Sequence, residues 1–100
     1  MIIYEVNLEI QSEILAEYLA WLKKHIAEIL QIEGFVKATI YKVERNDLEN
    51  SYAFSVQYYL ASREFLESYF ANHSQRLRQE GIDKFGDKFK ASRRILIEEF

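Results

Sequence analysis

The sequence predicts an α+β domain with the element order βαββαβ. Hydrophobic residues alternate with period two in four stretches, and stretches of helical periodicity separate the first from the second and the third from the fourth. A short polar segment between the two middle stretches is typical of a hairpin. This order is that of the ferredoxin-like split βαβ arrangement, a four-stranded antiparallel sheet with two helices on one face.

The first strand and the first helix are predicted at residues 2–10 and 13–31. In the first stretch the even-numbered residues are apolar and the odd-numbered ones mostly polar, as in a half-buried strand. In the second, apolar residues recur at steps of three and four, as on one face of an amphipathic helix. Ser12 is expected to cap this helix, and Gly34 to end the connection that follows it.

The central hairpin is predicted from strands at residues 35–45 and 52–60 around a polar turn at residues 45–51. The alternation is clear in the later strand, where the even-numbered residues are large and apolar. The two strands therefore pair antiparallel across the turn.

The second helix is predicted to begin after Ser62 and to end at Gly81, because apolar residues fall at helical spacing between these two residues. Residues 82–86 are expected to add one turn. Residues 90–99 are predicted to form the last strand.

Right-handed crossovers place both helices over one sheet face, with the strands in the order fourth, first, third, second. The other face is open and carries Glu5, Asn7, Glu9, Ser55, Gln57 and Tyr59. If the odd-numbered residues of the second strand point to the same side, they add Phe35, Thr39, Tyr41 and Val43 to this face. On the last strand either Arg93 or Arg94 faces the open side, and one of them is expected to pair with Glu5 or Glu9. Such a mixed face favours a homodimer in which two identical sheets pack together.

Composition restricts the class of protein. One hundred residues, of which 49% are hydrophobic, form a single domain over residues 1–100. A net charge of −3 argues against nucleic-acid binding, and the lack of cysteine excludes disulfides and thiolate sites. The longest apolar run, residues 18–22, is far shorter than the ~20 residues that span a membrane. Residues 1–5 lack the features of a secretory signal, so we expect a cytoplasmic protein.

The chain also resembles a bacterial family of unknown function whose members are about this long. The resemblance covers essentially the whole chain and is carried by the segments Met1-Ile2-Ile3-Tyr4-x-Val6, Tyr52, Val56-Gln57-Tyr58 and Phe85-Gly86-Asp87-Lys88-Phe89-x-Ala91-Ser92-Arg93. It implies a fold of the dimeric α/β-barrel group, in which two ferredoxin-like protomers share a barrel. That group includes cofactor-independent monooxygenases, isomerases, haem-degrading enzymes and ligand-sensing domains, and fold alone does not choose between them.

His73 is the candidate for acid–base catalysis. It lies at helical spacing with Leu66, Tyr69 and Leu77, so it is expected to point toward the sheet, where an imidazole could act as general acid or base. The alternative is a hydrogen-bonded histidine at the edge of the core.

Aromatic and basic residues are the candidates for ligand binding. An aromatic set could line a pocket for a flat ligand or simply fill the core: Tyr4, Tyr18, Trp21, Tyr58, Tyr69 and Phe70. Asn7 and Gln57 are expected to orient a substrate. Residues 76–94 carry seven basic and three acidic side chains, so Arg76 and Arg93 could hold a phosphate or carboxylate.

No cofactor or metal is predicted. Haem-degrading members of the fold group use an Asn on the first strand, a His on the second helix and a Trp; Asn7 and His73 match, but Trp21 lies on the first helix rather than later in the chain. His25 and His73 are isolated, without metal-ligand spacing.

Two functions remain open from the sequence. The first is a homodimeric module that binds a small aromatic or anionic ligand or a protein partner. The alternative is a cofactor-independent monooxygenase or isomerase acting on an aromatic small molecule. The sequence therefore does not decide whether the protein is an enzyme.

Overall fold

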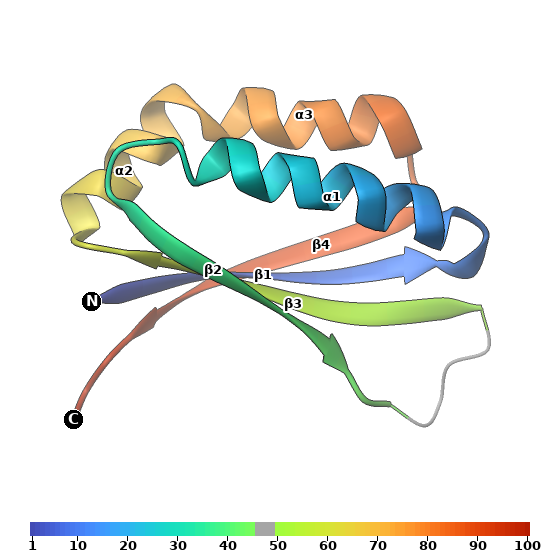
Figure 1. The fold of residues 1–100 in the computed structure, drawn as a ribbon, viewed down its shortest axis with the longest axis horizontal. Coiled ribbons are helices and arrows are strands. Elements are labelled where there is room, and N and C mark those ends of the chain that lie inside the picture. Colours follow the sequence, from blue (N-terminus) through green and yellow to red (C-terminus); the bar gives the residue numbers. More distant parts are fainter. Residues whose placement is uncertain (46–49) are drawn as a thin grey trace.

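The computed structural model describes residues 1–45 and 50–100 and arranges them in two layers, a sheet and a layer of helices (Figure 1). The elements are β1 (Ile2–Gln11), the 3-10 turn η1 (Ser12–Ile14), α1 (Leu15–Ile29), β2 (Phe35–Val43), β3 (Ser51–Leu60), α2 (Arg63–Asn72), α3 (Ser74–Phe85) and β4 (Phe89–Ile97). The polar turn predicted at residues 45–51 falls largely on residues 46–49, which lie outside the described residues. Within the described ranges, no helix is long and apolar enough to cross a membrane.

The four strands form one antiparallel sheet in the order β2-β3-β1-β4, which confirms the predicted spatial order. The central strand β1 pairs with β3 on one side and with β4 on the other, so that Tyr4 lies opposite both Tyr58 and Ile95. Figure 1 shows α1, α2 and α3 on the same side of this sheet. The opposite side, which we call the open face, has no helix over it among the described residues.

The helical layer contains three helices, so the predicted two-helix order βαββαβ is wrong and the observed order is β-α-β-β-α-α-β. The break falls at His73, where a φ of −133° and a ψ of −35° separate α2 from α3. The side chains of Asn72 and Ser74 donate hydrogen bonds to the carbonyls of Ser68 and Phe70, at 3.0 and 3.2 Å. Such bonds give the backbone an alternative to a continuous helix.

The predicted helix ends are also wrong in two places. Ser12 does not cap α1, because it begins the η1 turn and α1 starts only at Leu15. Gly81 does not end α3, which runs on to Phe85 and is capped by Gly86 with a φ of +62°. A Cβ at Gly81 would lie 3.0 Å from Trp21 Cη2, so the missing side chain allows α1 and α3 to approach.

A β-bulge near the start of β2 changes the face of one residue. The register with β3 shifts between Phe35 and Lys37. Phe35 is therefore buried under the helices, where its ring centroid lies 5.8 Å from that of Tyr58 and 5.1 Å from that of Tyr69. The prediction that Phe35 shares the open face with Tyr41 is wrong for this reason.

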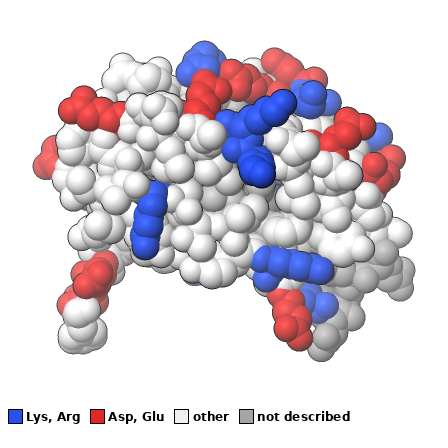
Figure 2. Space-filling model, in the orientation of Figure 1, with Lys and Arg blue, Asp and Glu red and all other residues white. Residues whose placement is uncertain are grey.

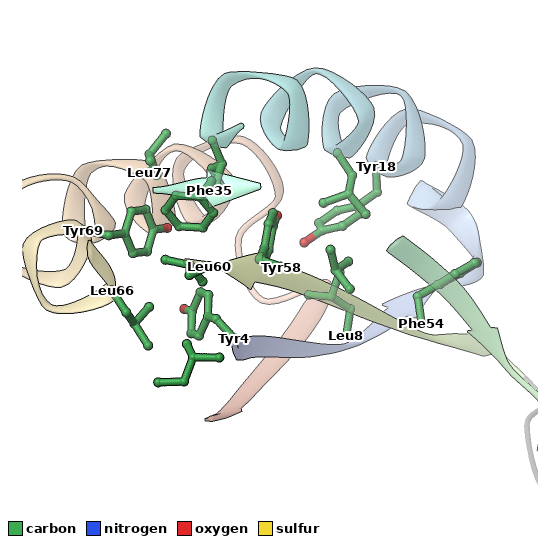
Figure 3. Packing of buried hydrophobic residues seen from close by; sticks show 14 of the residues in the cluster. Tyr4, Leu8, Tyr18, Phe35, Phe54, Tyr58, Leu60, Leu66, Tyr69 and Leu77 are labelled. Carbon is green, nitrogen blue, oxygen red and sulfur yellow. The ribbon is translucent and has the colours of Figure 1, made fainter. Parts of the chain in front are cut away.

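Aromatic and aliphatic side chains share the core between the sheet and the helices (Figure 3). Tyr4 is its central ring, with its centroid 6.0 Å from that of Tyr58, 5.9 Å from that of Tyr69 and 5.4 Å from that of Phe70. Figure 3 shows Tyr18 beside Leu8 toward the other end of the same layer. Ring-to-ring contacts therefore connect the sheet with the helices.

Candidate functional site

A cavity of about 260 Å³ lies between the sheet and the helices α1 and α3. Its floor is made by helix-facing residues of β1, β3 and β4, and its roof by residues of α1 and α3 together with Tyr69 of α2. The aromatic lining residues are Tyr4, Tyr18, Trp21, Tyr58, Tyr69 and Phe89. The polar lining comes from His25, Arg78 and Arg93, and no aspartate or glutamate of the described residues contributes to it.

A second, larger groove of about 460 Å³ lies between α1 and the helix-facing side of β2 and β3. Its walls are mostly apolar, with Phe54 as the aromatic residue and Lys23 and Lys42 as the charged ones. It has none of the buried polar atoms that give a binding site its orientation. We therefore take the smaller cavity as the candidate site.

One wall of the cavity is a stacked pair of rings on α1. The centroids of Trp21 and His25 are 4.4 Å apart and their planes differ by 24°. These two residues are four positions apart, so they occupy the same face of the helix. Because Gly81 gives Trp21 room, the indole is held between α1 and α3 and presents a flat surface.

The polar groups of the cavity are only partly bonded. Arg78 Nη2 donates a hydrogen bond to Tyr4 Oη at 3.0 Å. Arg78 Nε and His25 Nδ1 are buried and have no hydrogen-bond partner in the described part of the chain. Most buried polar atoms in folded proteins are hydrogen-bonded, so these two mark a site with unused bonding capacity.

Burial sets the protonation state of the lining. It lowers the pKa of His25 to about 4; Glu28 opposes this shift, and the positive charge of Arg93 adds to it. Burial likewise raises the pKa of Tyr69 to about 12, and it raises the pKa of Tyr18 and Tyr58 well above the usual range of a phenol. At neutral pH the imidazole is therefore uncharged and the phenols keep their protons.

The structure brings together four of the predicted ligand-binding residues. Trp21, Tyr58, Tyr69 and Arg93 all line the cavity. They come from α1, β3, α2 and β4, so the site depends on the tertiary fold rather than on a local motif.

His73 and Arg76, two other predicted site residues, lie outside the cavity. His73 is partly buried at the junction of α2 and α3, with its ring centroid 6.4 Å from that of Tyr69. Arg76 lies on the exposed side of α3 and pairs with Glu28 and Glu80, at 3.2 and 3.0 Å. The catalytic role predicted for His73 therefore has no support from this cavity.

Asn7 and Gln57 lie on the open face, and both donate hydrogen bonds of 2.9 Å to the Glu5 carboxylate. Arg94 Nε donates to the same carboxylate, which confirms the predicted pairing of an arginine on the last strand with Glu5. Bonding to Arg94 holds the pKa of Glu5 at about 2, with Asn7 and Gln57 acting in the same direction against burial. The residues predicted to orient a substrate thus serve a satisfied polar network on the opposite side of the sheet.

Two polar residues of the cavity were not among the predicted site residues. His25 follows Tyr18 and Leu22 on the buried side of α1, so helical spacing alone could have placed it there. Arg78 lies three residues before Gly81 on α3 and falls within the predicted second helix, but the sequence showed it only as one of the basic residues of 76–94. The described residues contain no cluster of His, Asp or Glu that could hold a metal ion.

The fold and the cavity define an α+β domain of the ferredoxin-like type with a pocket of small-molecule size between helices and sheet. The chain belongs to the family described as a domain of unknown function, DUF4286, whose family model matches residues 1–99. This confirms the resemblance inferred from the sequence. A search of curated proteins found no match.

Solved structures share this fold over nearly their whole length. A dimeric ferredoxin-like protein from an uncultured marine organism is 16% identical with a TM-score of 0.69, covering 100% of this chain and 98% of that chain. SnoaB, a cofactor-independent oxygenase from Streptomyces nogalater, is 14% identical with a TM-score of 0.66, covering 99% and 94%. The de novo designed protein Foldit4 is 16% identical with a TM-score of 0.66, covering 98% of each chain. An enzyme and a designed protein share the fold, so the function must be argued from the site.

Proposed function

We propose that this protein is a homodimeric module that binds a small molecule in the cavity between its helices and its sheet. The observation that carries the proposal is the combination of flat aromatic walls with buried polar atoms that lack a partner, Arg78 Nε and His25 Nδ1. Binding sites of this kind are mostly apolar, with a few polar groups that fix the orientation of the ligand. The lining favours a small aromatic or anionic ligand.

A second copy of the chain is the proposed partner at the open face. Tyr41 and Val43 leave 48% and 37% of their surfaces exposed there. The face also carries both signs of charge, as in Glu9 and Lys90, which lie opposite each other on β1 and β4. In a two-fold contact the same surface of each protomer packs against its copy. Acidic and basic side chains must therefore both be present on that surface if they are to pair across the interface. One of the similar solved structures is itself described as dimeric.

Native mass spectrometry of the protein as purified from cells tests both parts of the proposal. We expect a dimer that retains a small mass and releases it on denaturation. Ala91→Phe, which fills the cavity from β4, is expected to remain a dimer without that mass. Ala27→Phe, on the exposed side of α1, is the matched control and is expected to keep it. A dimer with no retained mass would favour a protein-interaction module, and a monomer would contradict the sheet-to-sheet contact.

A second candidate is a cofactor-independent oxygenase or isomerase acting on an aromatic molecule. The observation that favours it is the uncharged His25 at the cavity wall, because a neutral imidazole beside a bound substrate can accept a proton. Its test is turnover of quinols and related enolisable aromatics without added cofactor. An activity that falls at least 100-fold in His25→Phe and stays within a few-fold in His73→Phe would support this candidate, whereas no turnover would exclude it for these substrates.

A further inference from the structure

The cavity holds two cationic side chains and no anionic one. Arg78 and Arg93 line it from α3 and β4, and the described lining contains no carboxylate. The arginines near them in the sequence do form ion pairs: Arg76 pairs with Glu28 and Glu80, and Arg94 pairs with Glu5. No such pair forms at Arg78 or Arg93 within residues 1–45 and 50–100. The positive charge in the cavity is therefore not neutralised by the described chain.

Arg78 lacks a hydrogen-bond partner at Nε as well as an ion pair among the described residues. One of its terminal nitrogens bonds to the Tyr4 hydroxyl, but its Nε is buried and unbonded. A guanidinium presents its donors in a planar fork that matches the two oxygens of a carboxylate. The neutral Tyr4 hydroxyl occupies only part of this fork.

Arg93 extends the positive region toward solvent. It lines the cavity and is also exposed, so it stands at the boundary between the two. Its charge adds to the effect of burial in lowering the pKa of His25, and it opposes the burial that raises the pKa values of Tyr58 and Tyr69. The field of Arg93 thus reaches residues of α1, β3 and α2 around the cavity.

The remaining walls suit a flat ring. Trp21 and His25 form a stacked surface on α1, and Tyr18 lies 5.4 Å from Trp21, centroid to centroid. The phenols and the imidazole are uncharged at neutral pH, so they add no negative charge that would repel an anion. An apolar cavity of ~150 Å³ is enough for benzene, so about 260 Å³ leaves room for a ring with a charged substituent.

Resting on the proposed small-molecule function, we propose that the ligand is a planar aromatic carboxylate, whose ring lies along the Trp21–His25 wall and whose carboxylate binds Arg78 and Arg93. The structure favours an acid over an uncharged aromatic of the same shape because only the acid brings a negative charge to the two guanidinium groups. The two parts of the ligand match the two parts of the lining, flat and apolar at one wall and cationic at the other.

Matched pairs of acids and amides test this assignment. Benzoate is compared with benzamide, and 2-naphthoate with 2-naphthamide, by calorimetry and by the fluorescence of Trp21, the single tryptophan of the chain. We expect at least one acid to bind ten-fold or more tightly than its amide. Arg93→Gln and Arg78→Gln are expected to reduce that preference to three-fold or less, and the test rests on Arg93→Gln if Arg78→Gln does not fold.

Arg94→Gln is the matched control, since it removes the same charge one residue away on the opposite face of β4. An equal loss of preference in Arg94→Gln would show general attraction of anions and would overturn the assignment. Amides that bind as well as acids would also overturn it while leaving the small-molecule function standing. If neither class binds and native mass spectrometry finds no retained mass, the proposed function fails as well.

Discussion

Two consecutive arginines of β4 lie on opposite faces of the sheet and differ in whether they form an ion pair. Arg94 points to the open face and completes a network around Glu5, which is 3% exposed and accepts hydrogen bonds from three side chains. Arg93 lies on the helix-facing side of β4, where it lines the exposed edge of an aromatic cavity without a carboxylate among the described residues. The charge of Arg94 is paired within the protomer on the open face, and that of Arg93 has no ion pair among the described residues. The proposed ligand site rests on this difference.

The charged surface of the molecule supports the same distinction. Figure 2 shows acidic and basic side chains intermingled over the helical layer, with no extended area of one sign. Surface pairs such as Arg76 with Glu80 account for part of this mixture. The unpaired cations of the cavity are therefore a local feature and not part of a general positive field.

The largest expected effect concerns packing on the helix-covered face. Leu8→Ala removes a side chain that is 5% exposed in the core, and we expect it to lower the free energy of unfolding by about 2–5 kcal/mol. Ile3→Ala, on the same strand but on the half-buried open face, is expected to cost clearly less. Urea denaturation of both variants measures the difference. Equal losses would mean that the open face is packed as tightly as the core.

The next effect concerns the Glu5 network. Glu5→Gln removes a buried carboxylate bonded to Arg94, and we expect a loss of about 1.5–3 kcal/mol at pH 7. The pKa of Glu5 is about 2 in the folded protein, below its ordinary 4.5, so its stabilising effect is complete above pH 4.5 and disappears as the pH falls toward 2. Denaturation at several pH values should show the gap between wild type and variant closing in that window. A constant gap would contradict the ionic role of Glu5.

A smaller acid effect is expected in the cavity. The pKa of His25 is about 4 in the folded protein, below its ordinary 6.5, so the unfolded chain takes up a proton first as the pH falls. Stability should therefore decrease between pH 6.5 and 4, by about 1–2 kcal/mol because His25 is only partly buried. His25→Phe keeps a flat ring beside Trp21 and should remove this decrease, whereas His73→Phe should retain it. Thermal melts across this range test the difference.

The smallest expected effect is on stability at Arg93. Arg93→Gln breaks no ion pair in the described structure, so we expect the free energy of unfolding to change by less than about 0.5 kcal/mol. Arg94→Gln is expected to cost more, because it leaves the buried Glu5 carboxylate without its cation. If Arg93→Gln proved as destabilising as Arg94→Gln, Arg93 would have a structural role that the ligand proposal does not include.

The sheet could be predicted from the sequence because alternation identifies both the strand and its buried face. Tyr4 and Tyr58 were placed correctly under the helices on this basis. Phe35 was not, since a bulge adds a residue without any local signal in the alternation. The alternation also could not predict which of Arg93 and Arg94 faces the open side. Two adjacent charged residues fit the pattern equally well with either one facing outward.

The site was harder to predict than the fold. Trp21, Tyr58, Tyr69 and Arg93 were selected by residue type, but the sequence alone could not show that they share a cavity. His73 lies outside the cavity, at a break between α2 and α3 that helical periodicity does not register, and its catalytic role stays a prediction. Cavity residues that depend on the packing of α1 against α3 require the tertiary structure.

The most direct test follows the arginine Nε–H signals by two-dimensional ¹H–¹⁵N NMR during a titration with 2-naphthoate. Signals are assigned with the Arg78→Lys, Arg93→Gln and Arg94→Gln variants. We predict that the Arg78 and Arg93 signals shift in a saturable manner. The signal of Arg94, whose Nε–H donates to Glu5 on the open face, should stay in place. Shifts at Arg94 alone, or equal shifts at all three arginines, would contradict a carboxylate site under the helices.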